Sequence, residues 1–465
     1  MLQNNEDLLS VLVAPDDQSG LVMSGPCLAK SDGRTYPAIH GIPWLFEKPV
    51  PALLHWQAKV RLEQENLANR IREGKAKLPL PALNGKTRDR IRQIIKGQER
   101  NLKALSDLMG PLLQQEETGV AALEMLAGRS AAQQQLFAYE NVVFRDWGWQ
   151  GGEHDRNQAA LAFMEDHIPA SVEFGRTLVL GAGACRFPID FARRYRPDMT
   201  IACDINPFLL LVARTILGGG TLEYYEIPAV PKDFASAAVR RKLRMTDENP
   251  DNFYLVLADA LRPPFASGSM DVVLTPWFVD IVNVDFAGLA GHLNGLLKEG
   301  GHWICWGPLH FNNRGIEGLY SLDEVKILAK KAGFEITTHA VTRQDYLSSP
   351  ASALHRSDQV HCIVAKKIKS TSVALPEEAG KNVPEWILNP SQPIPRNQGI
   401  AAHLARHTLR QEILSLVDGA RSIRELTPLL TDKYGLNKDQ ALTTLLGFFT
   451  ELYEEEENQK FRSTG

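Results

Sequence analysis

The sequence predicts an α/β protein with a parallel sheet, a small β-rich module before it and a small helical domain after it. Residues 176–367 alternate short apolar runs, typical of buried strands, with helical segments. The chain has 465 residues, of which 44% are hydrophobic and 23% charged, which is ordinary globular usage and enough for more than one core. We therefore expect several folded units.

Charge and cysteine usage exclude several classes of protein. The chain has 51 Lys and Arg against 55 Asp and Glu, a net charge of −4, so no global positive field attracts nucleic acid or an anionic membrane. It has no run of 18 apolar residues and begins MLQNNEDLLS, unlike a secretory signal. The five cysteines are scattered and none stands at C-x-x-C spacing. We expect a cytoplasmic protein without nucleic-acid or membrane partners, and the sequence leaves the oligomeric state open.

Residues 1–50 form the predicted β-rich module. Short apolar runs between residues 8 and 47 are separated by turn residues at 15–17 and 31–33. The run from Tyr36 to Pro43 resembles the end of Trm112-like modules, which often carry a C-P-x-C zinc knuckle. Residues 14–17 of this chain read APDD at the matching place, so we predict no metal there.

The other predicted boundaries follow from composition and periodicity. Residues 51–150 are charged and helical in pattern, interrupted at 78–85, and we expect this region to pack on the catalytic domain. That domain is predicted over 151–367. Residues 368–400 are rich in Pro, Ser and Gly and read as a linker, and residues 401–465 read as three helices.

The stretch LVLGAGACR at 178–186 is the most informative motif, because it predicts a strand that enters a glycine-rich turn and then a helix. Gly181 and Gly183 lack a Cβ, which lets a ligand approach the backbone closely. Asp204 ends the next predicted strand and can accept both hydroxyls of a ribose. Asp259 and Ala260 end a third strand, where they can meet an adenine ring. The three strand ends should converge at the carboxyl edge of the sheet.

These features favour S-adenosylmethionine over NAD or ATP. A lone G-x-G also occurs in purely structural turns, but Arg186 replaces the third glycine of the dinucleotide fingerprint and no Walker lysine follows. We expect Arg186 or the turn amides to hold the methionine carboxylate and Asp204 the ribose. The predicted cofactor-binding residues are Gly181, Ala182, Gly183, Arg186, Asp204, Ile205, Asn206, Asp259, Ala260 and Thr275.

Five separated motifs carry a further resemblance. They are FRDW at 144–147, GAGxxR at 181–186, FVD at 278–280, WGPLHF at 306–311 and a Gly-Phe turn at 333–334. Over roughly residues 88–367 the sequence resembles the carnosine N-methyltransferase family. The resemblance implies a Rossmann-like class I methyltransferase fold, S-adenosylmethionine as cofactor and methylation of an imidazole nitrogen in a histidine-containing dipeptide. It also implies that Asp280 contacts the acceptor imidazole.

The chemistry of the residues agrees with that expectation. The carboxylate of Asp280 can accept the imidazole N–H, fix the tautomer and stabilise the developing imidazolium. An apolar wall is predicted from Trp277, Phe278, Trp306 and Phe311. The alternative is that Asp280 caps a helix and the aromatic residues are core.

The residues expected to bind the methyl acceptor depart from the family pattern. The family's histidine aligns with Asn312, although His310 is close enough to act in its place, and the aromatic cluster before the last strand is replaced by HRSDQVHC at 355–362. The predicted catalytic residues are Asp280, His310 and Asn312. We expect an altered acceptor rather than carnosine itself.

The C-terminal segment resembles PqqD-like domains, which are winged-helix-like and bind leader peptides. The resemblance rests on ILSLVDGARSIREL at 413–426 and FFTELYE at 448–454, and a generic dimerisation or stability module is the alternative. The predicted function is therefore methylation of a histidine imidazole in a small peptide or a delivered peptide substrate. RNA methylation and a non-catalytic peptide-binding scaffold are the other interpretations.

Overall fold

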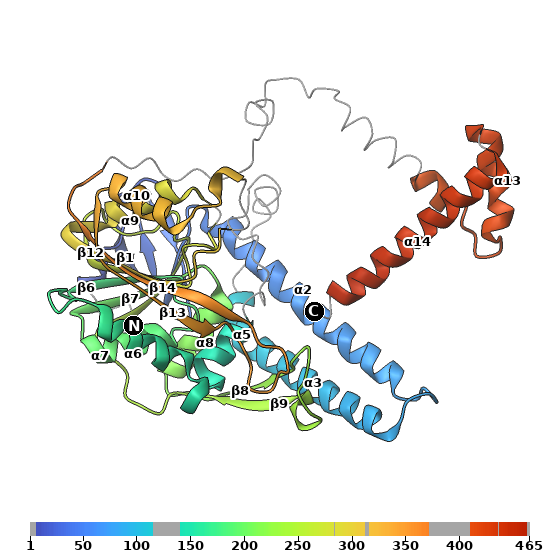
Figure 1. The fold of residues 1–465 in the computed structure, drawn as a ribbon, viewed down its shortest axis with the longest axis horizontal. Helices are drawn as coiled ribbons and strands as arrows, with labels where there is room; N and C mark the ends of the chain where they lie inside the picture. The colour runs from blue at the N-terminus through green and yellow to red at the C-terminus, as the bar shows by residue number, and fades with distance from the viewer. Residues whose placement is uncertain are drawn as a thin grey trace. The chain divides into compact units, whose positions relative to one another are not determined.

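A computed structural model describes residues 6–114, 140–282, 284–311, 316–371, 410–435 and 437–462. The chain forms two compact units, residues 1–380 and residues 381–465. The first unit is a large mixed sheet covered by helices, so the predicted α/β class is confirmed (Figure 1).

The first unit contains most of the secondary structure. Its strands are β1 (Val22–Ser24), β2 (Cys27–Ala29), β3 (Thr35–Tyr36), β4 (Ala38–Ile39), β5 (Ile42–Leu45), β6 (Arg176–Leu180), β7 (Met199–Asp204), β8 (Leu222–Glu226), β9 (Val239–Leu243), β10 (Phe253–Ala258), β11 (Met270–Pro276), β12 (Leu297–Gly307), β13 (Phe334–Asp345) and β14 (Ser357–Lys367). Its α-helices are α1 (Glu6–Leu9), α2 (Pro49–Lys77), α3 (Gly85–Leu113), α5 (Glu140–Val143), α6 (Arg156–His167), α7 (Arg186–Tyr195), α8 (Pro207–Leu217), α9 (Phe286–Leu296) and α10 (Leu322–Lys331). The short helices are η2 (Phe144–Gly148), η3 (Gly152–His154), η4 (Ala235–Ala237) and η5 (Ile316–Gly318).

The central sheet sets the position of every strand end in the predicted site. Its order is β13-β14-β12-β11-β6-β7-β10-β5-β4. Strands β12, β11, β6, β7 and β10 run parallel, and β14 is antiparallel to both β12 and β13. The carboxyl ends of β6, β7, β10 and β11 therefore meet at one edge, as the alternating pattern predicts.

Helices cover both faces of this sheet. In Figure 1, α6, α7 and α8 lie on one side and α9 and α10 on the other. Each face buries its own apolar cluster: Phe191 and Phe208 belong to the first, and Phe286, Trp303 and Phe334 to the second. Successive side chains of a strand point to opposite faces of the sheet. Each strand therefore contributes alternate side chains to the two clusters and so faces both helix layers.

The N-terminal strands are part of the same unit. Strand β5 pairs in parallel with β10, with Trp44 opposite Leu257, so the predicted N-terminal module extends the central sheet. At the knuckle position, the Lys30 Nζ pairs with Asp16 Oδ2 at 3.0 Å and with Asp17 Oδ2 at 2.7 Å. The Lys30 ammonium and these two carboxylates thus form an ion-pair cluster in the N-terminal segment.

The predicted break between two long helices is confirmed. Helix α2 ends at Lys77, and the side chain of Asn84 accepts a hydrogen bond from the Thr87 N–H at 2.8 Å, which caps α3. Asn101 of α3 then binds the backbone of Tyr225: its Nδ2 donates to the carbonyl and its Oδ1 accepts from the N–H, both at 2.7 Å. Helix α3 is therefore docked on β8 by polar contacts as well as by its apolar face.

The second unit is helical in its described residues. Residues 410–415, α13 (Ile423–Tyr434) and α14 (Lys438–Arg462) are helices. Ser422 and Glu425 form a capping box at the start of α13, and Gly435 ends it with φ +63°. The small core consists of Ile413, Leu426, Leu430, Ala441 and Leu445.

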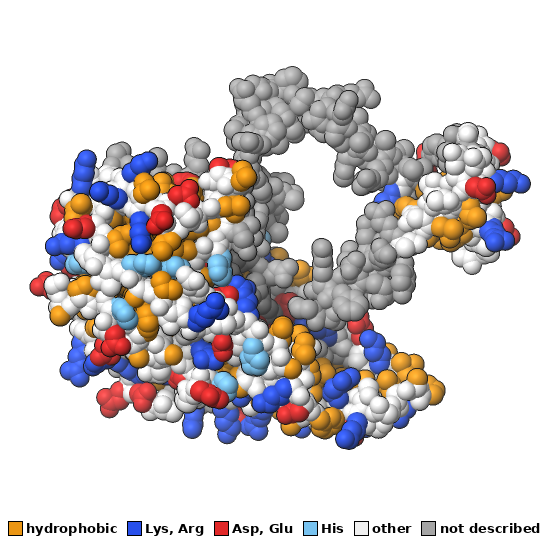
Figure 2. All heavy atoms as spheres, in the orientation of Figure 1, with side chains coloured by type: hydrophobic (Ala, Val, Ile, Leu, Met, Phe, Trp, Pro, Cys, Tyr) orange, Lys and Arg blue, Asp and Glu red, His pale blue; other side chains and the backbone are white. Residues whose placement is uncertain are grey.

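Two surface properties bear on partners. Within the described ranges, no helix combines the length and the apolarity needed to cross a bilayer. On the face of the first unit shown in Figure 2, basic and acidic side chains are interspersed. No single-sign field covers that face.

Candidate active site

The glycine turn after β6 is held by the neighbouring strand. Gly181 and Gly183 have φ values of +70° and +61°, which residues with a Cβ rarely adopt. The N–H groups of Gly181 and Ala182 both donate to the Cys203 carbonyl of β7, at 3.0 and 3.1 Å. A Cβ on Gly181 would lie 2.8 Å from Phe278 Cδ2. Glycine is thus required at 181 both by conformation and by packing.

Asp204 is tied directly to this turn. Its Oδ2 accepts the Gly183 N–H at 2.8 Å and its Oδ1 accepts the Asn206 N–H at 2.8 Å. Burial raises the pKa of Asp204 to about 6, although these two N–H groups act to lower it. The N–H of Ile205 acts on the same carboxylate, so three backbone N–H groups hold Asp204 in place and its remaining lone pair can accept from a ribose.

The remaining residues of the predicted cofactor half surround these strand ends. Asn206 caps α8 by accepting the Phe208 N–H, and half-buried Ile205 packs against the core. Asp259 follows β10 and its Oδ1 accepts the Leu261 N–H at 2.9 Å, while Ala260 is buried. Thr275 is fully buried, and its Oγ1 accepts the Trp303 Nε1–H. Thr275 therefore belongs to the core of the sheet.

The FRDW motif packs on the glycine turn from the other side. It forms the π-helix η2, in which Asp146 is 1% exposed. The Oδ2 of Asp146 accepts the Ala184 N–H at 3.1 Å, and the Trp147 Nε1 donates to the Ala184 carbonyl at 2.8 Å. Both backbone polar groups of Ala184 are thus held by this motif, at the end of the glycine turn. π-helices of one turn are frequent at functional sites.

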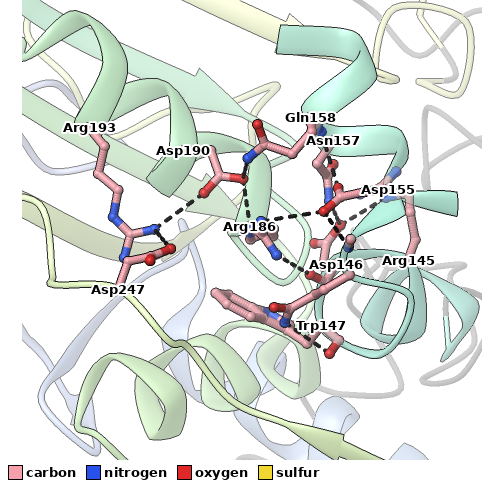
Figure 3. Close-up of polar contacts among 12 residues, drawn as sticks. Arg145, Asp146, Trp147, Asp155, Asn157, Gln158, Arg186, Asp190, Arg193 and Asp247 are labelled. Carbon is pink, nitrogen blue, oxygen red and sulfur yellow. Dashed lines mark hydrogen bonds and ion pairs between the residues drawn. The ribbon is translucent and has the colours of Figure 1, made fainter. Parts of the chain in front are cut away.

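Arg186 lies inside a buried network, whereas Arg145 faces the pocket. The Nε of Arg186 donates to Asp190 Oδ2 at 2.6 Å, and its Nη2 lies 3.7 Å from Asp155 Oδ2. Figure 3 shows these contacts and the Trp147 ring, whose centroid is 5.7 Å from the guanidinium. The Nε of Arg145 donates to Asp146 Oδ1 at 2.8 Å. The structure therefore places two guanidinium groups near the turn: Arg186 is paired with Asp190 and Asp155, and Arg145 is paired with Asp146 and lines the pocket.

A narrow pocket opens beside the glycine turn. Trp277 and Trp306 line it, as do Gly181 and Ala182 from the predicted cofactor half. Phe278 packs on Gly181 instead, and Phe311 packs against Phe286 and Tyr320, with ring centroids 5.9 and 5.5 Å apart. The residues lining the pocket are Arg145, Arg156, Asn157, Ala160, Gly181, Ala182, Phe187, Pro188, Pro276, Trp277, Trp306, Gln344, Asp345, Tyr346 and Leu347.

Asp280 lies just beyond this pocket. Strand β11 ends at Pro276, because Trp277 turns the chain with φ +52°. Asp280 therefore lies in the following turn, where its Oδ2 accepts the His310 N–H at 3.3 Å. Burial raises its pKa, Asp358 adds to the rise, and the His310 N–H opposes it. Asn312, the other predicted catalytic residue, lies outside the described residues.

Tyr346 supplies an aromatic contact that the sequence did not reveal. Its ring centroid is 5.1 Å from that of Trp277, and the Arg356 guanidinium lies 4.9 Å from the Tyr346 centroid. Arg356 also places Nη2 3.5 Å from His310 Nδ1. An aromatic pocket wall is thus built from the residue after β13 and the turn after β11, and residues 355–362 do not line the pocket.

Sequence reasoning missed Arg145, Asp146 and Tyr346 as site residues. An Arg-Asp pair between Phe144 and Trp147 is an unusual charge pair in an apolar setting, and this signal could have been used. Tyr346 follows a polar stretch and carries no comparable signal. In the described ranges, no group of three or more His, Cys, Asp or Glu is arranged to hold a metal ion.

Known proteins resemble this chain mainly in fold. No curated protein matches the sequence. Solved structures that resemble the fold include an S-adenosylmethionine-dependent methyltransferase from Thermotoga maritima, with 16% identity over 46% of this chain and 89% of that one and a TM-score of 0.28. Another is phosphoethanolamine N-methyltransferase 2 of Haemonchus contortus bound to S-adenosylmethionine, with 16% identity over 50% of this chain and 57% of that one and a TM-score of 0.30.

The family assignment rests on the sequence match and not on these distant structures. Residues 125–369, more than half of the chain, match the carnosine N-methyltransferase family. The glycine turn, the buried Asp204 with spare acceptor capacity and the pocket-facing Arg145 fit a cofactor that has a ribose and an amino-acid tail. The chain belongs to the carnosine N-methyltransferase family and is an S-adenosylmethionine-dependent methyltransferase with a Rossmann-like α/β fold.

Proposed function

We propose that this methyltransferase acts on an imidazole nitrogen of histidine in a small peptide or a peptide substrate. The observation that carries the proposal is the position of Asp280, a half-buried carboxylate beside the aromatic wall of Trp277 and Tyr346. The backbone N–H of His310 donates to its Oδ2 at 3.3 Å. Such a carboxylate can accept the N–H of a neutral imidazole and direct the other ring nitrogen to the methyl group.

On the cofactor side, the proposal assigns the ribose to Asp204 and the methionine carboxylate to Arg145. The Nη2 of Arg145 lies 3.6 Å from the position that a Cβ on Gly183 would take, so its guanidinium lies over the glycine turn. The Nε edge of the same guanidinium donates to Asp146 Oδ1, which fixes its orientation. Asp259 and Ala260, at the end of β10, are assigned to the adenine ring.

The chain's own residues then orient the acceptor and move a proton. S-Adenosylmethionine, when bound, supplies an electrophilic methyl group on a sulfonium. The imidazole nitrogen uses its lone pair to form the new N–C bond as the S–C bond breaks. Asp280 stabilises the imidazolium and takes the proton from its other nitrogen. The rings of Trp277 and Tyr346 favour a positive charge at their faces.

A methylation assay tests this proposal. Purified protein is incubated with S-adenosylmethionine and histidine-containing peptides, and mass spectrometry locates the methyl group. We expect an imidazole adduct, and we expect Asp280→Asn to lower turnover roughly 10²–10⁴-fold while cofactor affinity stays nearly unchanged. The matched control is Asp251→Asn, since Asp251 is exposed and precedes the amino end of β10, at the sheet edge opposite the strand ends of the site.

Two results contradict the assignment of Asp280. Normal turnover in Asp280→Asn would make it a structural residue. Loss of cofactor binding in proportion to activity would place it in the cofactor half. A methyl group found on a nucleic acid and on no peptide would instead favour RNA as substrate.

We also propose that residues 401–465 bind a leader peptide and that the enzyme works in the cytoplasm. Support for the first point is the resemblance to PqqD-like domains and the separate small core around Leu426 and Leu445. Support for the second is that all five cysteines are unpaired. Methylation of a long precursor by the full chain, compared with a chain ending at residue 380, tests the leader-binding role. Equal rates on the precursor would contradict it.

A further inference from the structure

A larger groove lies between α3 and the start of β8, which Figure 1 shows side by side. Its volume is about 660 Å³, and all of its lining residues differ from those of the pocket beside the glycine turn. Six of the lining residues are charged, four of them cationic and two acidic: Lys96, Arg100, Lys103 and Arg240, with Asp107 and Glu223. The groove therefore has a local net charge of +2, although the chain as a whole is acidic.

The two carboxylates occupy only two of the four cations. The ion pairs are Lys103 with Asp107 and Arg240 with Glu223. Lys96 and Arg100 are exposed, stand four residues apart on α3 and form no ion pair with a carboxylate of the described ranges. Like charges at this helical spacing repel each other. An anion bound between these two side chains would therefore be stabilised by both.

The outer edge of β8 lines the same groove. The N–H and carbonyl of Tyr225 point away from β9, since the Asn101 side chain binds both of them. In an antiparallel ladder, outward backbone groups recur at every second residue, so those of Glu223 point the same way. Within the part of the chain that the structure describes, these two groups of Glu223 make no hydrogen bond. The groove thus combines an unpaired strand edge with a row of cations.

This combination suits an extended peptide with acidic side chains. A peptide can pair its backbone with a strand edge, and the Asn101 amide already pairs with Tyr225 as a neighbouring strand would. Carboxylates on the peptide would then meet the cations of α3. A nucleic acid has no backbone amides to offer this edge, and the two carboxylates of the groove would repel its phosphates. The observations therefore favour an acidic peptide over a nucleic acid.

We propose that this groove binds an acidic, extended segment of the peptide substrate. Strand β8 leads from the groove to the acceptor side, because Glu226 at its end accepts the Trp149 Nε1–H and the Ser349 hydroxyl. A five-residue strand spans roughly 13–17 Å, so the acidic segment should lie several residues from the methylated histidine. The identity of the occupant rests on the proposed peptide substrate, whereas the preference of the groove for an acidic strand does not depend on methylation.

A binding experiment with the full-length protein tests this preference. The probe is an acetylated octapeptide in which glutamate and serine alternate, titrated by calorimetry at about 50 mM salt. We expect it to bind roughly tenfold more tightly than the same peptide with glutamine in place of glutamate, and to lose affinity as salt is added. Backbone N-methylation on the serines of one probe and on the glutamates of another should weaken at least one of the two about 3- to 10-fold.

Two matched double variants locate the binding site. Lys96→Gln with Arg100→Gln removes both cations that lack a carboxylate partner and should weaken probe binding about 3- to 30-fold. The control, Lys86→Gln with Arg90→Gln, removes two exposed cations from the start of the same helix, outside the groove, and should bind like the wild type. If the first double variant fails to fold, Arg100→Gln alone carries the comparison.

Three results overturn the groove as a site for an acidic strand. They are equal binding of the glutamate and glutamine peptides by the wild type, full affinity in the variant without the groove cations, and full affinity of both N-methylated probes. Binding of an eight-nucleotide oligothymidylate as tightly as the glutamate peptide would also contradict the inference, because the groove would then attract any polyanion.

Methylation assays separate this inference from the proposed function. If the glutamate peptide binds in the groove and no histidine peptide is methylated, the groove stands and imidazole methylation fails. If histidine peptides are methylated with the same KM with and without an attached acidic segment, imidazole methylation stands and the assignment of the groove to the substrate is wrong. A lower KM with the acidic segment, lost in the variant without Lys96 and Arg100, supports both.

Discussion

The carboxylate of Asp204 accepts the backbone N–H of Gly183 at 2.8 Å, which joins the end of β7 to the glycine turn after β6. The residue proposed for the ribose therefore also shapes the turn proposed for the methionine tail. Because burial raises the pKa of this carboxyl to about 6, its charge changes within an accessible pH range. With the ribose assigned to Asp204 as proposed, cofactor binding should be sensitive to both pH and turn geometry.

Cofactor affinity should fall as the pH is lowered through about 6. The ribose hydroxyls need a charged acceptor, and below its pKa Asp204 is increasingly protonated. The loss of cofactor affinity should therefore approach tenfold for each further pH unit. Calorimetric titration with S-adenosylhomocysteine between pH 5 and 8 measures this. Asp204→Asn should bind more weakly and show little pH dependence over that range. An equal slope in the variant would assign the dependence to another group.

Asp204→Ala should cost about 1–3 kcal/mol of cofactor binding free energy, because it removes the proposed acceptor of the ribose hydroxyls. The same calorimetry at pH 7.5 measures this cost. Unchanged affinity in the alanine variant would contradict the assignment of the ribose.

Gly181→Ala should destabilise the fold by about 1–3 kcal/mol and weaken cofactor binding. Alanine at φ +70° is strained, and its Cβ would lie 2.8 Å from Phe278. Gly219→Ala is the matched control: Gly219 has φ +78°, but a Cβ there would meet no atom within 4 Å, so only the backbone cost remains. Urea unfolding should show a larger loss for Gly181→Ala. Equal losses of stability would mean that the Phe278 side chain moves aside at no cost in free energy.

Arg145→Gln and Arg186→Gln should have different effects. Arg186 is buried with Asp190 and Asp155, so its removal leaves uncompensated carboxylates and should cost about 3–5 kcal/mol of stability. Arg145 lines the pocket and also pairs with buried Asp146 at 2.8 Å, so its loss should weaken S-adenosylhomocysteine binding and lower stability together, whereas Arg186→Gln should lower stability with little effect on binding. Thermal unfolding and calorimetry on both variants separate the two roles. The reverse pattern would mean that Arg186, and not Arg145, binds the methionine carboxylate.

Glu226→Gln should raise KM more than it lowers kcat. Glu226 is 2% exposed; it accepts the Arg241 Nε–H at 2.7 Å, the Trp149 Nε1–H at 3.2 Å and the Ser349 hydroxyl. Ser349 follows Tyr346 in the loop after β13, so weaker contacts should loosen the aromatic wall. Steady-state kinetics with a histidine peptide measures the change. An unchanged KM would show that this loop is held by other contacts.

Local sequence signals predicted the strands that lead to the cofactor. The runs TLVL, TIACD and FYLVLA became β6, β7 and β10, since buried parallel strands need continuous apolar residues whatever surrounds them. The glycine turn and the break before α3 were also predictable, because positive φ and helix capping depend on neighbouring residues. Strand β13 was not predicted: its exposed and buried residues alternate imperfectly, and its pairing with β14 holds it in the sheet.

The sequence by itself determined the α/β class, the glycine turn and Asp204 as the acidic residue of the next strand, and it predicted Asp280 as the carboxylate that meets the acceptor. Only the tertiary structure decided that Arg186 is occupied by Asp190 and Asp155 while Arg145 faces the pocket, and that Tyr346 joins Trp277. The physical reason is that capping, strand formation and turns depend on residues adjacent in the chain. The partner of a guanidinium or a ring depends on which distant strands and helices meet, and a single sequence does not encode that contact in any local pattern.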